Sequence, residues 1–207
     1  MKLIVLTVLL CCSCCADAQI NWAITAGGQS ATASYTSEGT KIATHSIAGF
    51  NAGVLARIYF DNKVAFVTGL QFNARGFAIK TIPDDTQKTY HLNYVVIPLL
   101  LQFDLSKKAG AGLYGKLGPS VGIGINGREL YTGANGNQVR NKAVLSMTGN
   151  HFGLFDASLN AAFGYSIKQH FFVEAAYAYG IGNVNNDPAG PNIKSRVLSL
   201  SAGYFFR

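Results

Sequence analysis

Cysteine is missing from most of this 207-residue chain, because all four cysteines lie between positions 11 and 15. The remainder therefore has neither a disulfide framework nor a thiol nucleophile. Charge is also scarce, at 13% of residues. The 17 lysines and arginines give a net charge of +7, but they are spread along the chain and only Lys107 and Lys108 are adjacent. Nucleic-acid-binding proteins gather such residues into a patch or stripe, so we expect no nucleic-acid partner.

Long apolar runs are absent beyond the N-terminal segment. The longest, Val95–Leu101, is interrupted by Pro98. No segment there has the roughly 20 apolar residues that a transmembrane helix needs. A membrane protein with this sequence would have to cross the bilayer with strands.

Signatures of enzymatic and metal chemistry are weak. Gly110–Gly115 matches G-x-G-x-x-G, but it opens a β pattern, whereas a dinucleotide site needs a helix there. The histidines show no H-x-x-x-H spacing, so we expect no metal and no cofactor. A lipid hydrolase would need His151 beside Asp156 and Ser158, or His91 beside Asp84 and Asp85, and we expect no catalytic residues. The four histidines are His45, His91, His151 and His170.

The first 18 residues are predicted to be a cleaved signal peptide. Lys2 supplies the positive start, Leu3–Leu10 the apolar stretch, and Ala16–Ala18 the A-x-A cleavage motif before Gln19. The apolar stretch is too short to cross a bilayer as a helix. We expect an exported protein whose single domain spans residues 19–207, without the four cysteines.

What the rest of the chain does contain is two-residue alternation of apolar and polar side chains, in eight segments that are predicted to be β-strands. The connections between them alternate strictly between long and short. Short turns at one end and long loops at the other are typical of an outer-membrane barrel. The predicted fold is therefore all-β, an eight-stranded antiparallel up-and-down transmembrane β-barrel. The segments are Ile20–Ala31, Ile47–Phe60, Val64–Ala78, Thr89–Leu105, Ala111–Asn126, Phe152–Ile167, His170–Gly182 and Lys194–Arg207. The short joins are Asp61–Lys63, Ser106–Gly110 and Lys168–Gln169, and the long ones Thr32–Ser46, Ile79–Lys88, Gly127–His151 and Asn183–Ile193.

The two faces of each predicted strand differ in kind. In Val64–Ala78, for example, Phe66 and Leu70 share one face while Gln71 and Arg75 share the other. A soluble sandwich would bury the apolar face and a membrane barrel would turn it to lipid, which periodicity alone does not decide. Segment length favours the membrane, because the segments run to 12–17 residues. Strands of globular sheets usually have about five or six, and roughly 9–11 are enough to cross a bilayer.

The predicted fourth strand has two apolar faces. Its inner set contains Tyr94, Val96 and Leu100, which is consistent either with an apolar patch inside the barrel or with packing on a partner. Pro98 removes one ladder hydrogen bond and so predicts a local bulge or kink. A bulge anywhere would exchange the two faces of the strand beyond it.

The run Leu92–Leu101 (LNYVVIPLLL) and the aromatic last strand, with Gly203–Phe206 (GYFF), resemble a known group. The chain looks like a member of the PorT-like outer-membrane β-barrel family of Bacteroidetes, and is more distantly similar to OmpA/OmpX-type barrels. The resemblance covers the whole predicted domain. It implies residence in the bacterial outer membrane with the N-terminus in the periplasm, and it implies little about biochemistry.

Assigning strand faces by parity places six charged side chains in the lumen. A charge that faced the lipid midplane would cost a few kcal/mol. An eight-stranded barrel has an interior just wide enough for side chains to fill, so we expect these residues to form a polar network that plugs it. Gln71, Asn73, Gln102 and Asn160 would complete the network. The six charged residues are Arg57, Arg75, Asp104, Lys116, Asp156 and Glu174.

The long connections carry excess positive charge. Lipid phosphates lie at the same depth, so these cations are candidates for a contact with lipopolysaccharide. The candidates are Lys80, Lys88, Arg128, Arg140 and Lys142.

The sequence thus predicts a monomeric, non-enzymatic outer-membrane protein with a structural or surface-interaction role. Its expected partners are outer-membrane lipid and other envelope proteins. Three alternatives stay open: a narrow pore or transporter, a lipid-modifying enzyme, and a soluble barrel that binds an apolar ligand.

Overall fold

The computed structural model describes residues 20–37, 39–81, 86–106, 110–143, 145–146, 152–185, 187 and 190–206. The predicted signal peptide, residues 1–18, lies outside these ranges. In the described part of the chain, no helix is long and apolar enough to cross a membrane.

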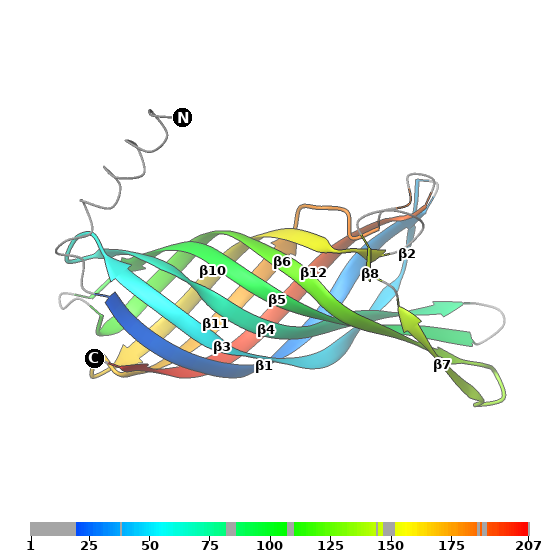
Figure 1. The fold of residues 1–207 in the computed structure, drawn as a ribbon, viewed down its shortest axis with the longest axis horizontal. Helices are drawn as coiled ribbons and strands as arrows, with labels where there is room; N and C mark the ends of the chain where they lie inside the picture. The colour runs from blue at the N-terminus through cyan, green and yellow to red at the C-terminus, as the bar shows by residue number, and fades with distance from the viewer. Residues whose placement is uncertain are drawn as a thin grey trace.

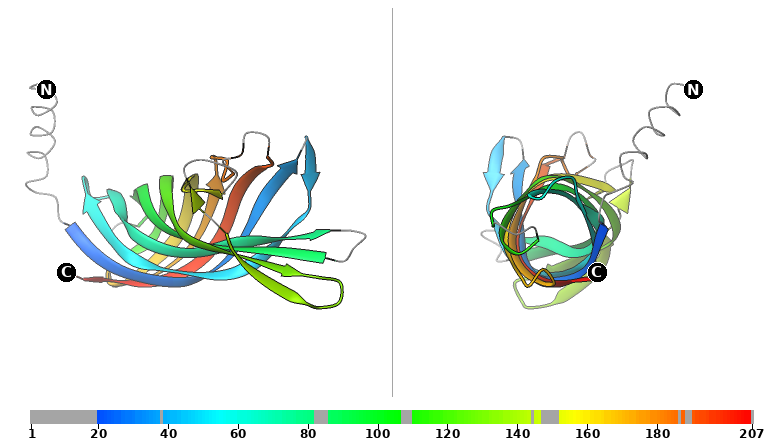
Figure 2. Two further views of the ribbon diagram at one scale, coloured as in Figure 1. Left: turned by 45° about the vertical axis from the view of Figure 1, so that its right-hand side comes forward. Right: turned by 90° about the vertical axis from the view of Figure 1, so that its left-hand side faces the viewer.

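Eight long strands form a closed antiparallel ring in chain order, as Figures 1 and 2 show. The ring closes by pairing of β6 with β10, and the view along its axis in Figure 2 is round. This is the predicted up-and-down barrel. The strands are β1 (Ile20–Ser37), β3 (Thr44–Tyr59), β4 (Val64–Thr81), β5 (Thr86–Asp104), β6 (Gly112–Thr132), β10 (Phe155–Ile167), β11 (Phe171–Gly180) and β12 (Asn192–Phe206).

The long connections contain more strand than the sequence predicted. β1 continues to Ser37 and β6 to Thr132, beyond the predicted ends at Ala31 and Asn126. β6 pairs there with β7, so a hairpin projects past the barrel rim (Figure 1). Its turn is closed by the Gly133 N–H, which donates to the carbonyl of Asn137 at 2.9 Å. Three short strands lie in these connections: β2 (Thr40–Ile42), β7 (Gln138–Ala143) and β8 (Leu145–Ser146). The predicted strand Phe152–Ile167 is divided into β9 (Phe152–Gly153) and β10.

The opposite end of the barrel has the short turns that were predicted. Between β10 and β11, Lys168 and Gln169 both have positive φ, at 50° and 65°. Two such residues form the type I′ turn that matches the twist of a two-residue hairpin. The His170 N–H closes the turn on the carbonyl of Ile167 at 3.1 Å.

The outer face of the barrel is apolar and the inner face is mixed. Leu200 on β12 is 62% exposed on the outside, whereas Phe172 on β11 is on the inside and 1% exposed. The apolar residues on the inner side of β5 lie in the lumen: Tyr94 and Val96 are buried there together with Leu92. An apolar patch in the lumen, rather than a partner surface, therefore accounts for the inner face of β5.

The register along β5 corrects the expectation about Pro98. Pro98 lies opposite Ser120 on β6 and the register does not shift there, so there is no bulge at Pro98, but the ladder to β4 is interrupted between Val96 and Leu99. The bulge falls instead where Asn93 pairs with Asn126 but Tyr94 pairs with Gly124. β6 therefore has one more residue than β5 over this stretch. Such an unpaired extra residue is a β-bulge.

This bulge exchanges the faces of β6. Below it, even-numbered side chains such as Lys116 and Ser120 are buried in the lumen. Above it, Glu129 lies on the inner face, where it accepts a hydrogen bond from Tyr90, and Arg128 is exposed on the outer face. The projecting hairpin thus has an inner and an outer side that parity counting from the barrel would have reversed.

Candidate functional site: the lumen and the long-loop mouth

The structure places all six predicted lumen charges inside the barrel. Five of them are at most 7% exposed, and the side chain of Glu174 is 14% exposed. Their contacts fall into groups at different heights along the barrel axis. The sequence supplied the residues, but which side chains meet depends on the stagger of the strands.

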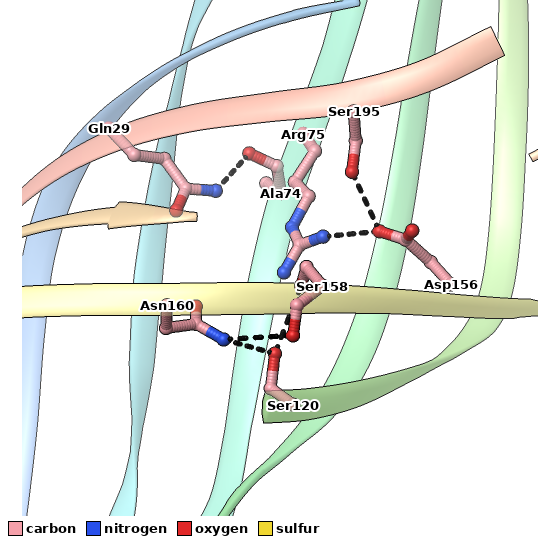
Figure 3. A network of polar contacts seen from close by, with 8 residues as sticks. All are labelled: Gln29, Ala74, Arg75, Ser120, Asp156, Ser158, Asn160 and Ser195. Atoms are coloured by element: carbon pink, nitrogen blue, oxygen red, sulfur yellow. Dashed lines mark hydrogen bonds and ion pairs between the residues drawn. The ribbon is translucent and has the colours of Figure 1, made fainter. Parts of the chain in front are cut away.

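The group nearest the long loops is an ion pair across the barrel (Figure 3). Arg75 Nη1 donates to Asp156 Oδ2 at 2.7 Å, and Ser195 Oγ donates to the same oxygen at 2.9 Å. The ring of Tyr94 lies 5.5 Å from the guanidinium carbon of Arg75. Three strands, β4, β10 and β12, are therefore joined through the lumen at this level.

A band of neutral polar side chains lies next along the axis (Figure 3). The hydroxyls of Ser120 and Ser158 are 3.0 Å apart, and Asn160 Nδ2 donates to Ser120 Oγ at 2.8 Å. On the other side, Gln29 Nε2 donates to the carbonyl of Ala74 at 2.6 Å. Gln29, Ser120 and Asn160 border a cavity of about 70 Å³, which Gln71 and Asn73 also line. A water molecule needs roughly 10–15 Å³ by this measure, so the cavity has room for a few.

A second ion pair lies toward the short-turn end. Lys116 Nζ is 2.5 Å from Glu174 Oε2, which also accepts a hydrogen bond from the Tyr114 hydroxyl at 3.0 Å. The Lys116 ammonium lies 5.6 Å from the ring centre of Phe172. The pair is thus enclosed by aromatic side chains, which lowers the local dielectric and strengthens the attraction.

Asp104 organises the short-turn end itself. Its carboxylate accepts hydrogen bonds from the Tyr59 hydroxyl at 2.8 Å, from Gln102 Nε2 at 2.7 Å and from the Gly110 N–H at 2.6 Å. The last of these holds the turn between β5 and β6. Arg57 lies beside this group, with its guanidinium carbon 3.7 Å from the ring centre of Phe205.

Sequence reasoning missed several partners of these charges. Tyr59 and Tyr114 share the inner parity of Arg57 and Lys116, so alternation was a sufficient signal for them. Ser195 likewise shares the inner parity of Val197 and Phe205 on β12, so alternation places it in the lumen but does not say which charge it meets. Its contact with Asp156 spans 39 residues of sequence.

The five predicted surface cations are all exposed, and the structure brings part of the set together. Arg128 on β6 lies directly opposite Lys142 on β7. Arg140 is two residues away from Lys142 and shares its face, since side chains alternate along a strand. Lys80 is on the outer face of β4, whereas Lys88 pairs with Ile79 and Tyr131, which places it on the inner face of the projecting sheet.

Of the groups considered for catalysis, Asp156 and Ser158 make other contacts, His91 is exposed on β5, and the others lie outside the described residues. Asp156 is held by Arg75, and Ser158 by Ser120; His151, Asp84 and Asp85 lie outside the described ranges. His170 stacks on Tyr204 with ring centres 5.7 Å apart. Among the described residues, no cluster of His, Cys, Asp and Glu could hold a metal ion.

The mouth at the long-loop end is closed by apolar packing above the Arg75–Asp156 pair. Phe77, Val184 and Ile193 are buried there together with Ala33. Tyr90 packs against Phe77 and Phe152, with 5.1 Å between ring centres in each case. Above this floor a pocket of about 380 Å³ opens, lined by residues of β1, β5, β6, β7 and the β11–β12 connection.

A closed antiparallel ring, an apolar outer belt and a polar lumen define the class of protein as an outer-membrane β-barrel. Residues 16–186 match the model of the family described as outer membrane protein beta-barrel domain. The chain belongs to this family, and it is a protein of the bacterial outer membrane.

Solved structures of small outer-membrane barrels are similar in fold. Ail of Yersinia pestis, solved in complex with the heparin analogue sucrose octasulfate, is 17% identical, with 91% of this chain and 99% of that chain covered and a TM-score of 0.49. Neisserial surface protein A is 15% identical, with 89% and 97% covered and a TM-score of 0.46. OprG of Pseudomonas aeruginosa is 14% identical, with 90% and 96% covered and a TM-score of 0.43. No curated protein sequence matches the chain.

Proposed function

We propose that this protein is a non-enzymatic, monomeric outer-membrane barrel whose lumen is plugged by its own side chains and whose long loops face the cell exterior as an interaction surface. The observation that carries this proposal is the pair of buried ion pairs, Arg75–Asp156 and Lys116–Glu174, at two heights of the lumen. Residues 1–18 are proposed to be the signal peptide that directs export. Membership of the PorT-like group of Bacteroidetes is part of the same proposal.

Energetics favour a permanent plug over a gate. Removing one partner of a buried ion pair leaves an uncompensated charge and costs about 3–5 kcal/mol. The two pairs therefore resist separation at ordinary pH and salt. The cavity between them is about 70 Å³, too small for a solute much larger than water. A narrow pore would need a continuous polar path, and the apolar cluster of Phe77, Val184 and Ile193 lies across it.

Single-channel recording in planar bilayers tests the plug. The wild-type protein is expected to give no discrete conductance steps. A variant in which Arg75, Asp156, Lys116 and Glu174 are replaced by Ala, together with Phe77→Ala and Ile193→Ala in the apolar cluster, removes both ion pairs and opens the cluster, and is the positive control, expected to conduct. Heat-modifiable migration on gels shows that each protein has folded. Discrete steps from folded wild-type protein would contradict the proposal.

The position of the cations on the outer face of the β6–β7 hairpin supports a contact between that hairpin and lipopolysaccharide. Like charges directly opposite each other on neighbouring strands destabilise a sheet, and Arg128 and Lys142 are in that arrangement. A lipid phosphate that accepts hydrogen bonds from both would offset the repulsion. We include Arg140 on the same face of the hairpin and Lys80 on the outer face of β4 in this surface, and propose Lys88, on the inner face of the projecting sheet, as a separate contact. Other envelope proteins are proposed as further partners.

Native mass spectrometry of the detergent-purified protein tests the lipid contact. Arg128→Gln with Lys142→Gln is expected to reduce bound lipopolysaccharide severalfold. Lys63→Gln with Lys168→Gln, which changes exposed lysines in the β3–β4 and β10–β11 turns at the other end of the barrel, is the charge-matched control. Equal lipid binding by both variants would remove the hairpin from the proposed lipid surface.

A further inference from the structure

The pocket above the closed mouth has a blind, aromatic interior. Tyr35 from β1, Tyr90 from β5 and Phe152 from β9 all line it, and they pack on the buried cluster that contains Phe77 and Ile193. The floor separates the pocket from the lumen, so it is a recess that opens outward and not a channel entrance. Its volume of about 380 Å³ lies within the range of small-molecule sites.

Two carboxylates border this aromatic interior. Glu129 Oε1 accepts a hydrogen bond from the Tyr90 hydroxyl at 3.2 Å, which aims the carboxylate into the pocket. Asp187 lines the pocket from the β11–β12 connection. The N–H of Asp187 donates to Asn185 Oδ1 at 3.2 Å, and Asn185 Nδ2 donates to the carbonyl of Pro191 at 2.9 Å. Glu129 and Asp187 thus reach the pocket from two different segments of the chain.

Lys142, the one lysine among the described residues that line the pocket, points away from the carboxylate of Glu129. In the register of β6 and β7, it lies directly opposite Arg128. Paired residues project from the same face of a sheet, and neighbours along a strand project from opposite faces. The Lys142 side chain thus leaves the sheet on the side of Arg128, away from Glu129. Lys88 is on the inner face of the same sheet but is not one of the described residues that line the pocket. Glu129 therefore provides a carboxylate at an aromatic recess whose surrounding rim carries positive charge.

We propose that this pocket binds a small organic cation, an amine or quaternary ammonium group attached to an apolar body. The cation would lie against the faces of Tyr35, Tyr90 and Phe152, which attract positive charge through their ring quadrupoles. Glu129 would supply the counter-charge, and the apolar floor would take the body of the ligand. This binding goes beyond the proposed surface role, because it requires only the mouth and neither lipid contact nor a plugged lumen.

Tyr90 keeps its hydroxyl as a hydrogen-bond donor under all ordinary conditions. Burial, reinforced by the charge of Glu129, raises the pKa of Tyr90 above its usual value near 10. A neutral tyrosine therefore continues to hold the carboxylate in position throughout the pH range in which amines are protonated.

Isothermal titration of the full-length protein in a non-ionic detergent tests the proposal. The probe is benzyltrimethylammonium, and benzyl alcohol and benzoate are its neutral and anionic counterparts. The cation is expected to bind and the other two to bind at least about tenfold more weakly, since a cation–π contact and a carboxylate together contribute on the order of 1–2 kcal/mol. Equal binding of benzyl alcohol, preferential binding of benzoate, or no binding of the cation would each overturn the proposal.

Variants then locate the site. Glu129→Gln keeps an acceptor for Tyr90 and is expected to weaken cation binding about tenfold, while Phe152→Leu keeps an apolar side chain and is expected to weaken it severalfold. Asp61→Asn removes one negative charge from the exposed β3–β4 turn at the opposite end and should leave binding unchanged. Unchanged affinity in Glu129→Gln, or an equal loss in Asp61→Asn, would refute the assignment. Bilayer recordings report on the plug separately, so the two proposals fail independently.

Discussion

The guanidinium carbon of Arg57 lies 3.7 Å from the ring centre of Phe205, which connects β3 to the last strand of the barrel across the lumen. Both side chains are at most 2% exposed. The contact is a cation–π interaction without competing water, the setting in which such interactions contribute about 2 kcal/mol or more. It fastens the C-terminal strand from inside, next to the edge where β12 meets β1.

Phe205→Leu tests this attachment. The variant keeps an apolar side chain but loses the ring under Arg57, so we expect the free energy of unfolding to fall by about 2 kcal/mol. Urea unfolding in lipid vesicles, followed by tryptophan fluorescence of Trp22 on β1, measures it. Phe206→Leu changes the neighbouring ring, which is on the outer face, and serves as the control. A similar loss in both variants would attribute the effect to aromatic packing in general.

Asp156→Asn tests the ion pair nearest the long loops. Asn keeps an acceptor for Ser195 but leaves Arg75 without its counter-charge, so the expected loss is about 3–5 kcal/mol. Replacing both partners, Arg75→Met with Asp156→Leu, removes the buried charge altogether and should recover most of that loss. Urea unfolding of Arg75→Met, Asp156→Leu and their combination completes a double-mutant cycle and gives the coupling energy. Additive losses in the cycle would mean that the two charges do not stabilise each other.

Tyr90 gives a prediction about pH. Its pKa is raised in the folded protein, first by burial and then by Glu129, above the ordinary value of 10.0. Its contribution to stability is therefore fully present below about pH 10 and is lost as the pH rises toward the folded pKa. Wild-type protein should lose more stability than Tyr90→Phe between pH 9 and about pH 12. Unfolding measured at both pH values tests this, and parallel losses in the two proteins would contradict it.

Gln169→Gly tests the two-residue turn. Gln169 has φ of 65°, a conformation that costs an L-residue roughly 1 kcal/mol and costs glycine little. We expect the free energy of unfolding to rise by up to about 1 kcal/mol. The gain is reduced because glycine makes the unfolded chain more flexible. Lys63→Gly, in a turn for which no such strain exists at that residue, is expected to be neutral or destabilising. A loss of stability in Gln169→Gly would show that the side chain contributes more than the backbone strain costs.

Alternation along the chain was enough to predict the eight strands and the inner position of charges such as Arg57 and Lys116. It was enough because a barrel strand faces lipid on one side and side chains on the other. It could not predict that Arg75 meets Asp156, since 81 residues separate them and their meeting depends on the stagger of β4 against β10. The hairpin of β6 and β7 was also missed, because Gly133–Gln138 and its neighbours are rich in turn-forming residues.

The bulge in β6 near Asn126 has a consequence for how the rim acquires its charge. Glu129 faces the pocket and Arg128 faces outward because one extra residue precedes them. Deleting that residue, with no change in composition, would turn the arginine inward and the glutamate toward the lipid headgroups. The sign of the potential on each side of the mouth is therefore set by the number of residues between the barrel and the hairpin, and a length change there would act as a charge reversal.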